Sequence, residues 1–476
     1  MESTVAQTAS PRSPAPGTPL AVPIRPAAGA PPADPLVGHL LQVRRGMLTF
    51  LMRISRDYGD VVPVRYGPQT VLMLHHPDLI EAVLVTQQRN FSKGRFYRLL
   101  TPLLGEGLLT AEGDLWRRQR RLAQPAFHRQ RVAAYGRTMV GYTERMLAGW
   151  RPGEVRDVHA DMMRLTLEIV VKTLLDADAA GEAAAVGEAL PVALHELNGL
   201  MNGPAFLLPQ AVPTAGKWRL GRAVRRLDGF VYKLIAERRA APADRGDLLS
   251  MLMAAQDESA GGPPGSAAGG GMSDRQLRDE VMTIMLAGHE TTALALSWTW
   301  YLLSEHPEVD ARLRDELRAA LGGRPPEVAD LPRLAYTERV LSEAMRLYPP
   351  IPVIGRQAVD ACDLGGYHVP AGTPVSFAQW SVQRDPRFFD APDAFRPERW
   401  EDGLARRLPR FAYFPFGGGP RLCIGNAFAT MEATLILATV AQRFRPRLAP
   451  GHPVVPVPAL TLRPANGLRM RVDPAA

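Results

Sequence analysis

Apolar residues recur at three- and four-residue spacing along much of the chain, which is the periodicity of helices that bury one face. The pattern is clear over 161–175 and 220–239. It returns over 331–348 and ends at Pro349, because proline lacks the N–H that the next helical bond needs. A further apolar helical pattern covers 424–442. The middle and C-terminal parts of the chain are therefore predicted to be mainly helical.

One predicted helix is unusually long. Its pattern runs from Asp274 to about Glu305, before Pro307. Ser273 and Gln276 have capping-box spacing, in which each side chain binds a free backbone N–H at the helix start. The sequence thus predicts a helix over 274–305 with a defined beginning.

Short strands are predicted at two places. Residues 61–65 and 70–74 flank a turn at Gly67, and 353–359 and 366–370 follow the helix that ends at 348. The predicted fold class is mainly α with a minor β portion.

Three segments interrupt these patterns. Residues 1–35 contain nine prolines and eight alanines, which indicates an extended, disordered tail before a single catalytic domain over 36–476. Residues 260–271 are almost wholly Gly, Ala, Pro and Ser, as in a flexible loop. The region Asn198–Trp218 mixes glycines and prolines with apolar residues. We interpret it as irregular, either a mobile lid or an ordinary surface connection.

Composition narrows the class of protein. The chain has 476 residues, 46% hydrophobic and 22% charged, as in a globular enzyme. No run approaches the roughly 20 apolar residues that span a bilayer, and no secretory signal is evident. We therefore expect a soluble, cytoplasmic protein. With two cysteines and no CxxC pair, neither a disulfide framework nor a zinc site of that kind is predicted.

The net charge of +8 leaves nucleic-acid binding open at this point. However, the arginines are concentrated in one stretch, and no recognisable nucleic-acid module accompanies them. This basic cluster consists of Arg117, Arg118, Arg120, Arg121, Arg129 and Arg131.

The segment from Phe416 to Gly425 carries the clearest chemical signal. Its three consecutive glycines would weaken a helix or strand, but they suit a backbone that turns tightly against a flat, bulky group. Cys423 follows just before the predicted helix over 424–442, where free N–H groups favour a thiolate. The alternative is a buried structural cysteine.

Phe416, Gly419, Cys423 and Gly425 stand at the spacing F-x-x-G-x-x-x-C-x-G, which resembles the heme-binding loop of the cytochromes P450. The resemblance implies that Cys423 is the thiolate ligand of the iron in heme b. It implies a cytochrome P450 fold, with heme between the long oxygen-activation helix and the helix that follows the cysteine loop. The loop residues implied to bind the cofactor are Phe416, Gly417, Arg421, Cys423 and Gly425.

Within the long helix, Ala287, Gly288, Glu290 and Thr291 resemble the oxygen-activation motif of the same family. Gly288 is expected to remove bulk where dioxygen would lie. Thr291 can bond to the carbonyl of Ala287 and open a groove there. Glu290 and Thr291 would then relay protons. The alternative is a helix interior with incidental threonines.

The spacing of Glu343 and Arg346 matches the E-x-x-R pair of the family, which joins a downstream arginine in a buried ionic network. Arg399, in the segment 397–400, is implied as that third member. Alone, such a pair is more often exposed on a helix.

Trp116 and Arg120 match the W-x-x-x-R of the family and are implied to bind the heme propionates, together with Arg356 and Arg421. Each position taken singly could also be a surface charge. The resemblance extends from Leu36 to the C-terminus. One departure is Gln383, before Arg384, where many members have histidine, and we interpret it as a variation in a structural turn.

The resemblance implies a monooxygenase that hydroxylates or epoxidises a lipophilic small molecule such as a terpenoid, fatty acid or macrolide-like product. The expected pocket segments are 95–109, 206–212, 285–292 and 351–354. Besides O2, the implied partners are a ferredoxin or flavodoxin with an NAD(P)H-dependent reductase, and the basic cluster is the expected docking face.

Two alternatives within this fold stay open. One is a peroxide-using peroxygenase or isomerase, whose members typically lack the acid–threonine pair. The other is a non-catalytic heme carrier, which would leave Glu290 and Thr291 without a role.

Overall fold

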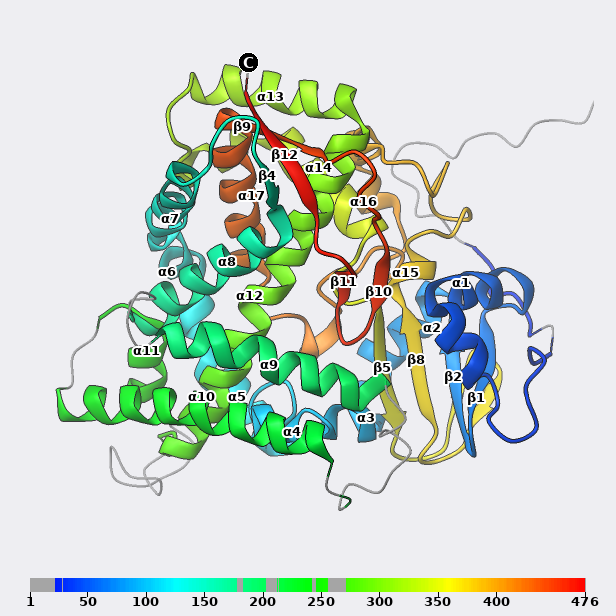
Figure 1. Cartoon of the computed structure of the whole chain (residues 1–476). Coiled ribbons are helices and arrows are strands. Elements are labelled where there is room, and N and C mark those ends of the chain that lie inside the picture. Colours follow the sequence, from blue (N-terminus) through cyan, green and yellow to red (C-terminus); the bar gives the residue numbers. More distant parts are fainter. Residues whose placement is uncertain are drawn as a thin grey trace, which may run out of the picture.

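The computed structural model describes residues 22–27, 29–177, 183–202, 212, 214–241, 245–255 and 271–475. Helices form most of the molecule, and a smaller part rich in strands lies to one side (Figure 1). The fold class predicted from the sequence, mainly α with a minor β portion, is confirmed.

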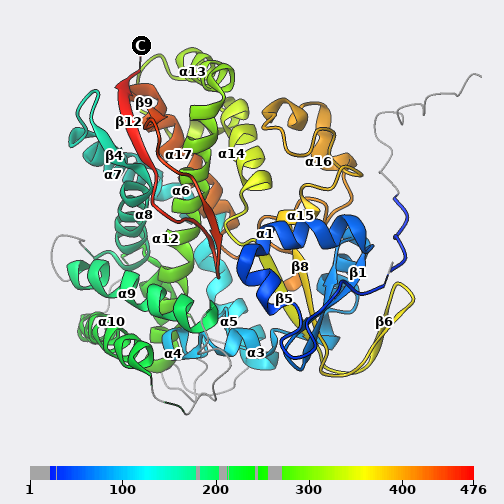
Figure 2. The ribbon, with the colours of Figure 1, turned by 45° about the vertical axis from the view of Figure 1, so that its right-hand side comes forward.

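The long helix α12, Asp274–Glu305, runs through the centre of the helical part (Figures 1 and 2). Its predicted bounds and its capping box of Ser273 and Gln276 are confirmed. Buried residues occur all round it, because other helices cover its sides. These are α8 (Val158–Leu175), α10 (Ala215–Ala240), α14 (Ala335–Leu347) and α17 (Asn426–Arg443).

A five-stranded sheet forms the core of the strand-rich part, in the order β1-β2-β8-β5-β3. Its strands are β1 (Val61–Tyr66), β2 (Gln69–Leu74), β3 (Phe91–Ser92), β5 (Val353–Ala358) and β8 (Pro374–Ala378). Within this sheet β2 and β8 are parallel and the other pairs are antiparallel. The buried face of α1 (Leu40–Asp57) packs against it through Phe50, Leu51 and Ile54.

Three smaller sheets complete the β portion. One has the order β4-β12-β9, with β4 at Val155–Asp157, β9 at Phe444–Leu448 and β12 at Arg469–Pro474. A second is the hairpin of β10 (Pro456–Pro458) and β11 (Leu462–Pro464), and the third pairs β6 (Cys362–Leu364) with β7 (Tyr367–Val369).

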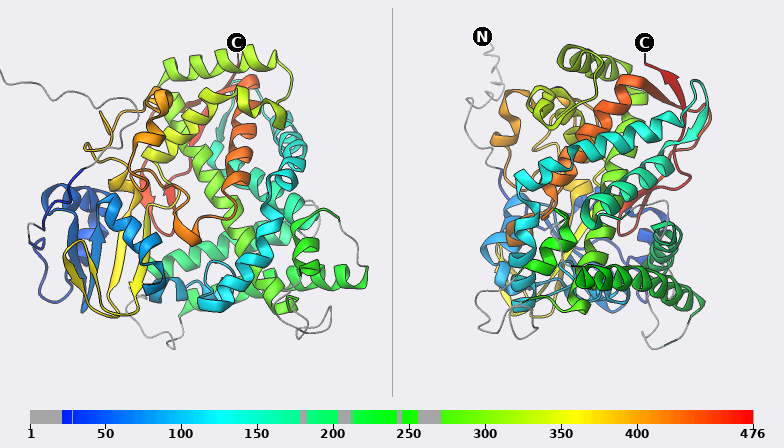
Figure 3. Two further views of the ribbon diagram at one scale, coloured as in Figure 1. Left: turned by 180° about the vertical axis from the view of Figure 1, so that it is seen from behind. Right: turned by 90° about the vertical axis from the view of Figure 1, so that its left-hand side faces the viewer.

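The other helices surround this frame, and Figure 3 shows α17 and its neighbours from behind. They are α2 (Pro77–Glu81), α3 (Gly94–Arg98), α4 (Thr101–Leu104), α5 (Gly113–Ala123), α6 (Arg129–Ala134), α7 (Gly136–Ala148), α9 (Ala183–Asn202), α11 (Leu248–Ala254), α13 (Pro307–Leu321), α15 (Gln379–Val382) and α16 (Leu404–Arg407).

The prediction of an irregular stretch over Asn198–Trp218 is wrong at both ends. Helix α9 continues through Asn202, and α10 begins at Ala215, where the side chain of Thr214 accepts a hydrogen bond from the backbone of Lys217. This cap and the packing of α9 on α10 outweigh the local glycines and prolines. Residues 203–211 and 213 lie outside the described residues, as do 260–270 of the predicted flexible loop.

The helix predicted over 331–348 begins later than expected. Residues Val328–Arg333 form a 3-10 turn that contains Pro332, and α14 starts only at Ala335. Proline removes an N–H that a helix interior would use, so the α-helix begins after it.

Part of the predicted tail packs against the body of the protein. Arg25 donates through Nε and Nη2 to Oδ1 of Asp60, at 3.2 and 3.0 Å. Asp60 is fully buried and is also bound by Arg387. Residues 22–27 therefore contact the body of the protein, and the disorder expected for 1–35 stays a prediction. Residues 1–21 lie outside the described part, and the division at residue 36 stays a prediction. Among the described helices, none is long and apolar enough to cross a membrane.

Candidate active site

The loop that carries Cys423 is shaped by its glycines. Gly417 and Gly419 adopt positive φ angles of 71° and 66°, which favour glycine. A Cβ on Gly419 would lie 1.8 Å from the carbonyl oxygen of Leu84, so no side chain fits there. The loop then returns to donate the Cys423 N–H to the carbonyl of Phe416 at 3.0 Å. These constraints hold Cys423 at one position before α17.

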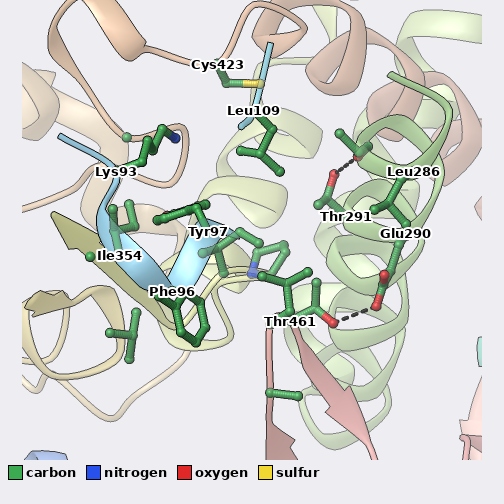
Figure 4. Close-up of a pocket in the computed structure, with 18 of the residues that line it drawn as sticks. Lys93, Phe96, Tyr97, Leu109, Leu286, Glu290, Thr291, Ile354, Cys423 and Thr461 are labelled. Atoms are coloured by element: carbon green, nitrogen blue, oxygen red, sulfur yellow. Dashed lines mark hydrogen bonds between the residues drawn. The ribbon is translucent and has the colours of Figure 1, made fainter. Parts of the chain in front are cut away.

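The thiol of Cys423 faces a cavity (Figure 4). Burial raises its pKa, while a hydrogen bond from the backbone of Gly425 and the charge of Arg120 oppose that change. Gly425 is the N-cap of α17. A bound metal ion would remove the proton outright, and the N–H and the cation would then stabilise the thiolate.

The cavity has a volume of about 2080 Å³ and lies between the cysteine loop and α12. Three of the expected pocket segments contribute to it, namely 95–109, 285–292 and 351–354. The fourth, 206–212, falls almost wholly outside the described residues. The sequence did not reveal that α1, the β1–β2 hairpin and the β10–β11 tip also line it, because they are close only in the fold. Representative apolar lining residues are Met47, Leu109, Val224, Leu286, Ile354 and Leu460.

The α12 wall contains the expected oxygen-activation residues. The hydroxyl of Thr291 donates to the carbonyl of Ala287 at 2.9 Å, as predicted (Figure 4). Ala287 is itself exposed to this cavity. Gly288 lines the cavity as expected, and a Cβ there would lie 3.0 Å from Val170 of α8. Its small size therefore also allows α12 and α8 to pack closely.

Glu290 is buried on the same helix, and its carboxylate is turned toward the β10–β11 hairpin (Figure 4). Oε1 accepts hydrogen bonds from Oγ1 of Thr461 at 2.5 Å and from Nε of Arg463 at 2.6 Å. The sequence did not indicate either partner, because the hairpin lies more than 170 residues away along the chain.

Four cationic side chains and one indole lie near the cysteine loop on the wall of the cavity. Arg421 stacks on Trp116, with 4.2 Å from the guanidinium carbon to the ring centroid, and Arg120 donates to the carbonyl of Leu422 at 2.9 Å. Arg356 and Lys93 complete the group. The structure thus brings the four predicted propionate partners, Trp116, Arg120, Arg356 and Arg421, to the wall of one cavity.

This group has an excess of positive charge. Burial, assisted by Arg356, lowers the pKa of Arg421 to about 10, although Glu112 binds its guanidinium. Burial also lowers the pKa of Lys93 well below its usual value, with repulsion from Arg356 and Arg421 added. A ligand that brings two carboxylates would relieve that repulsion. The four cations fit the two propionates of heme. The glycine-rich loop and the thiol of Cys423 fit its flat ring and its iron.

Lys93 was missed by sequence reasoning, since a lone lysine after a short strand carries no motif. It precedes α3, its ammonium lies 4.4 Å from the ring centroid of Tyr97, and it lines the cavity (Figure 4). Only the fold shows that it joins Arg356 and Arg421.

Glu343, Arg346 and Arg399 form one buried network away from the cavity. Arg346 donates to both carboxylate oxygens of Glu343, at 2.8 and 2.9 Å, and Arg399 donates to Oε1 at 2.7 Å. Trp400 adds a hydrogen bond from its indole at 3.0 Å. Gln383, the departure noted in the sequence, accepts from the N–H of Phe414 and donates to the end of α14. It therefore links the network to the segment before the cysteine loop.

Comparisons with known proteins agree with this geometry. The family model described as "Cytochrome P450" matches residues 29–470. Cyclooctatin synthase of Streptomyces melanosporofaciens is 40% identical over 94% of this chain and 95% of its own. Pentalenene oxygenase of Streptomyces avermitilis is 38% identical over 93% and 96%.

A solved structure titled as a cytochrome P450DA heme domain superposes with a TM-score of 0.83, at 27% identity, over 95% of this chain and 98% of the other. The family model, the relatives and the structure agree with each other over nearly the whole length. The chain therefore belongs to the cytochrome P450 family of heme b-dependent monooxygenases.

Proposed function

We propose that this protein hydroxylates or epoxidises a lipophilic terpenoid. In the balanced reaction, the substrate takes one atom of O2, and two electrons and two protons convert the other to water. The observation that carries the proposal is the large, mostly apolar cavity that joins the thiol of Cys423 to the groove at Ala287 and Thr291. The relatives are named for cyclooctatin, cyclooctat-9-en-7-ol and pentalenene, which supports a terpenoid over a fatty acid or macrolide.

When bound, heme supplies the activation of O2, and Cys423 is its proposed iron ligand. Trp116, Arg120, Arg356 and Arg421 would bind the propionates, with Lys93 as an additional cation. Phe416, Gly417 and Gly425 would form the surface on which the cofactor rests. The apolar wall orients the substrate and excludes water.

Glu290 and Thr291 are the proposed proton relay. The hydroxyl of Thr291 lies at the cavity wall, and Glu290 is the carboxylic acid next to it on α12. Protons reach the cavity from this side through the two side chains and water. The presence of the pair favours reductive activation of O2 over the peroxygenase or isomerase alternative.

The proposed electron donor is an acidic ferredoxin or flavodoxin that is reduced by an NAD(P)H-dependent reductase. The proposed location is the cytoplasm, where NAD(P)H is available. Arg117, Arg121 and Arg131 are exposed on α5 and α6. Arg120 of the same helix α5 contacts the residue before Cys423. A basic surface beside the ligand cysteine would steer an acidic donor to it.

Two measurements test the proposal. Titration of the ferric protein with pentalenene should shift the spin state, with hydroxylated product formed only when NAD(P)H and redox proteins are supplied. Efficient turnover with hydrogen peroxide alone would instead establish the peroxygenase alternative. For the docking face, the reduction rate by ferredoxin should fall steeply as salt rises, and Arg121→Glu should reduce it further.

A further inference from the structure

Glu290 is held by one hairpin through two side chains. Besides the bonds from Thr461 and from Nε of Arg463, Nη2 of Arg463 lies 2.5 Å from the same carboxylate oxygen. The Glu290 side chain is 3% exposed, whereas that of Arg463 is 26% exposed. Arg463 therefore connects a buried carboxylate to the protein surface.

The direction of the carboxylate matters because Glu290 and Thr291 are consecutive on α12, and consecutive side chains of a helix do not share a face. Thr291 points back to the carbonyl of Ala287, and Glu290 points to Thr461 (Figure 4). In this arrangement the acid is directed to the hairpin and not to the hydroxyl that it would supply.

Two histidines interact with Glu290, one on α8 and one on α12. Burial lowers the pKa of His159 to about 4, and its Nδ1 lies 3.1 Å from Oγ of Ser297. Burial also lowers the pKa of His289, whose Nδ1 lies 3.1 Å from the carbonyl of Met285. Both are neutral near pH 7, so Arg463 provides the positive charge that contacts Glu290.

The same hairpin forms part of the cavity wall. Its tip residues Ala459 and Leu460 line the cavity beside Thr461. At the base of the tip, the carbonyl of Leu462 accepts a hydrogen bond from Nε1 of Trp298 on α12 at 2.9 Å. A substrate that presses on the tip therefore touches the element that holds Glu290, only one residue from Thr461.

We infer that Arg463 is a positioning residue that holds the relay acid on the substrate-lining hairpin, so that proton supply depends on how this hairpin is placed. The inference rests on the proposed proton-relay function of Glu290. Without Arg463, the carboxylate retains only Thr461 among these partners and loses its fixed direction. Proton delivery to the cavity would then no longer depend on substrate position, and electrons from NADPH would reduce O2 to peroxide or water instead of forming product.

The test compares Arg463→Gln, Arg463→Lys and Glu290→Gln with the wild-type holoenzyme. Arg447→Gln is the matched control, because Arg447 pairs with Asp473 in a sheet remote from the cavity wall. Two quantities are measured with redox proteins and NADPH, namely product formed per NADPH and the solvent isotope effect on turnover. Substrate affinity, from the spin-state shift, reports whether each variant is intact.

The expected result is a fall of about fivefold or more in product per NADPH for Arg463→Gln, with a changed solvent isotope effect. Arg463→Lys should recover at least half of the coupling, and Arg447→Gln should match the wild type. Peroxide-driven turnover, which brings its own protons, should change less than twofold. Wild-type coupling and isotope effect in Arg463→Gln would overturn the inference. If Arg463→Gln fails to fold, Arg463→Met replaces it, and wild-type coupling with an unchanged solvent isotope effect in Arg463→Met would overturn the inference.

Glu290→Gln separates the two levels of the proposal. If it abolishes reductase-driven turnover while Arg463→Gln has no effect, Glu290 acts as the relay and only the role of Arg463 is wrong. If Glu290→Gln has no effect either, the proposed relay itself is wrong. Where both act, adding Arg463→Gln to Glu290→Gln should cost nothing further, because the two residues work as one unit.

Discussion

Arg346 and Glu343 form an ion pair at 2.8 Å in which neither side chain has any exposed surface. Arg399 and Trp400 donate to the same carboxylate, so Glu343 orients three side chains at once. A pair of this kind is costly to break, because the remaining partner stays buried and charged.

Glu343→Ala is therefore expected to lower the free energy of unfolding by about 3–5 kcal/mol. Urea denaturation of the purified protein measures the change. The matched control is Glu144→Gln, which breaks a half-exposed pair with Arg443 and should cost less than about 1 kcal/mol. Similar losses in both variants would show that the buried network is not a special source of stability.

Heme retention should depend on the cation that the sequence did not reveal. Lys93→Gln removes a charge from the group with Arg356 and Arg421, so the rate of heme loss should rise several-fold. Transfer of heme to apomyoglobin measures that rate independently of catalysis. Arg89→Gln is the control, since Arg89 is exposed just before β3 and is not among the residues that line the cavity in the described part of the chain. An unchanged rate in Lys93→Gln would exclude a propionate contact for Lys93.

Stability should also depend on pH through Glu280 of α12. Burial raises the pKa of this carboxyl from 4.5 to about 8, although the N–H of Leu108 donates to it. Between pH 4.5 and about 8, the Glu280 carboxyl is protonated in the folded protein and ionised in the unfolded chain. Its contribution to the free energy of unfolding therefore falls as pH rises through this range and does not change further above about pH 8.

Glu280→Gln removes this titration. The slope of unfolding free energy between about pH 5 and pH 7.5 should therefore become less negative, by up to about 1.4 kcal/mol per pH unit. Urea denaturation across that range tests the prediction. An unchanged slope would mean that Glu280 is already ionised in the folded protein.

The sequence predicted those parts of the protein that depend on local spacing. Helix α12 was placed correctly because its periodicity, its capping box and the following proline agree. The resemblance to the family's E-x-x-R pair, and not the three-residue spacing alone, indicated the buried network of Glu343 and Arg346. The role of Cys423 was implied by the resemblance of its glycine-rich loop to the heme-binding loop of the family, and it stays a prediction.

What the sequence did not predict depends on long-range packing. Lys93, Thr461 and Arg463 reach the site from segments with no motif of their own. The helical ends of the segment 198–218 depend on contacts between α9 and α10. The close approach of Val170 on α8 to Gly288 is also visible only in the fold, and the space for dioxygen expected at Gly288 stays a prediction.

Thiolate ligation by Cys423 is the central claim, and the absorption spectrum of the dithionite-reduced protein with and without carbon monoxide tests it most directly. The account predicts a strongly red-shifted Soret band with carbon monoxide, which Cys423→Ala abolishes. A Soret band at the position typical of histidine or protonated-thiol ligation in the intact protein would contradict it.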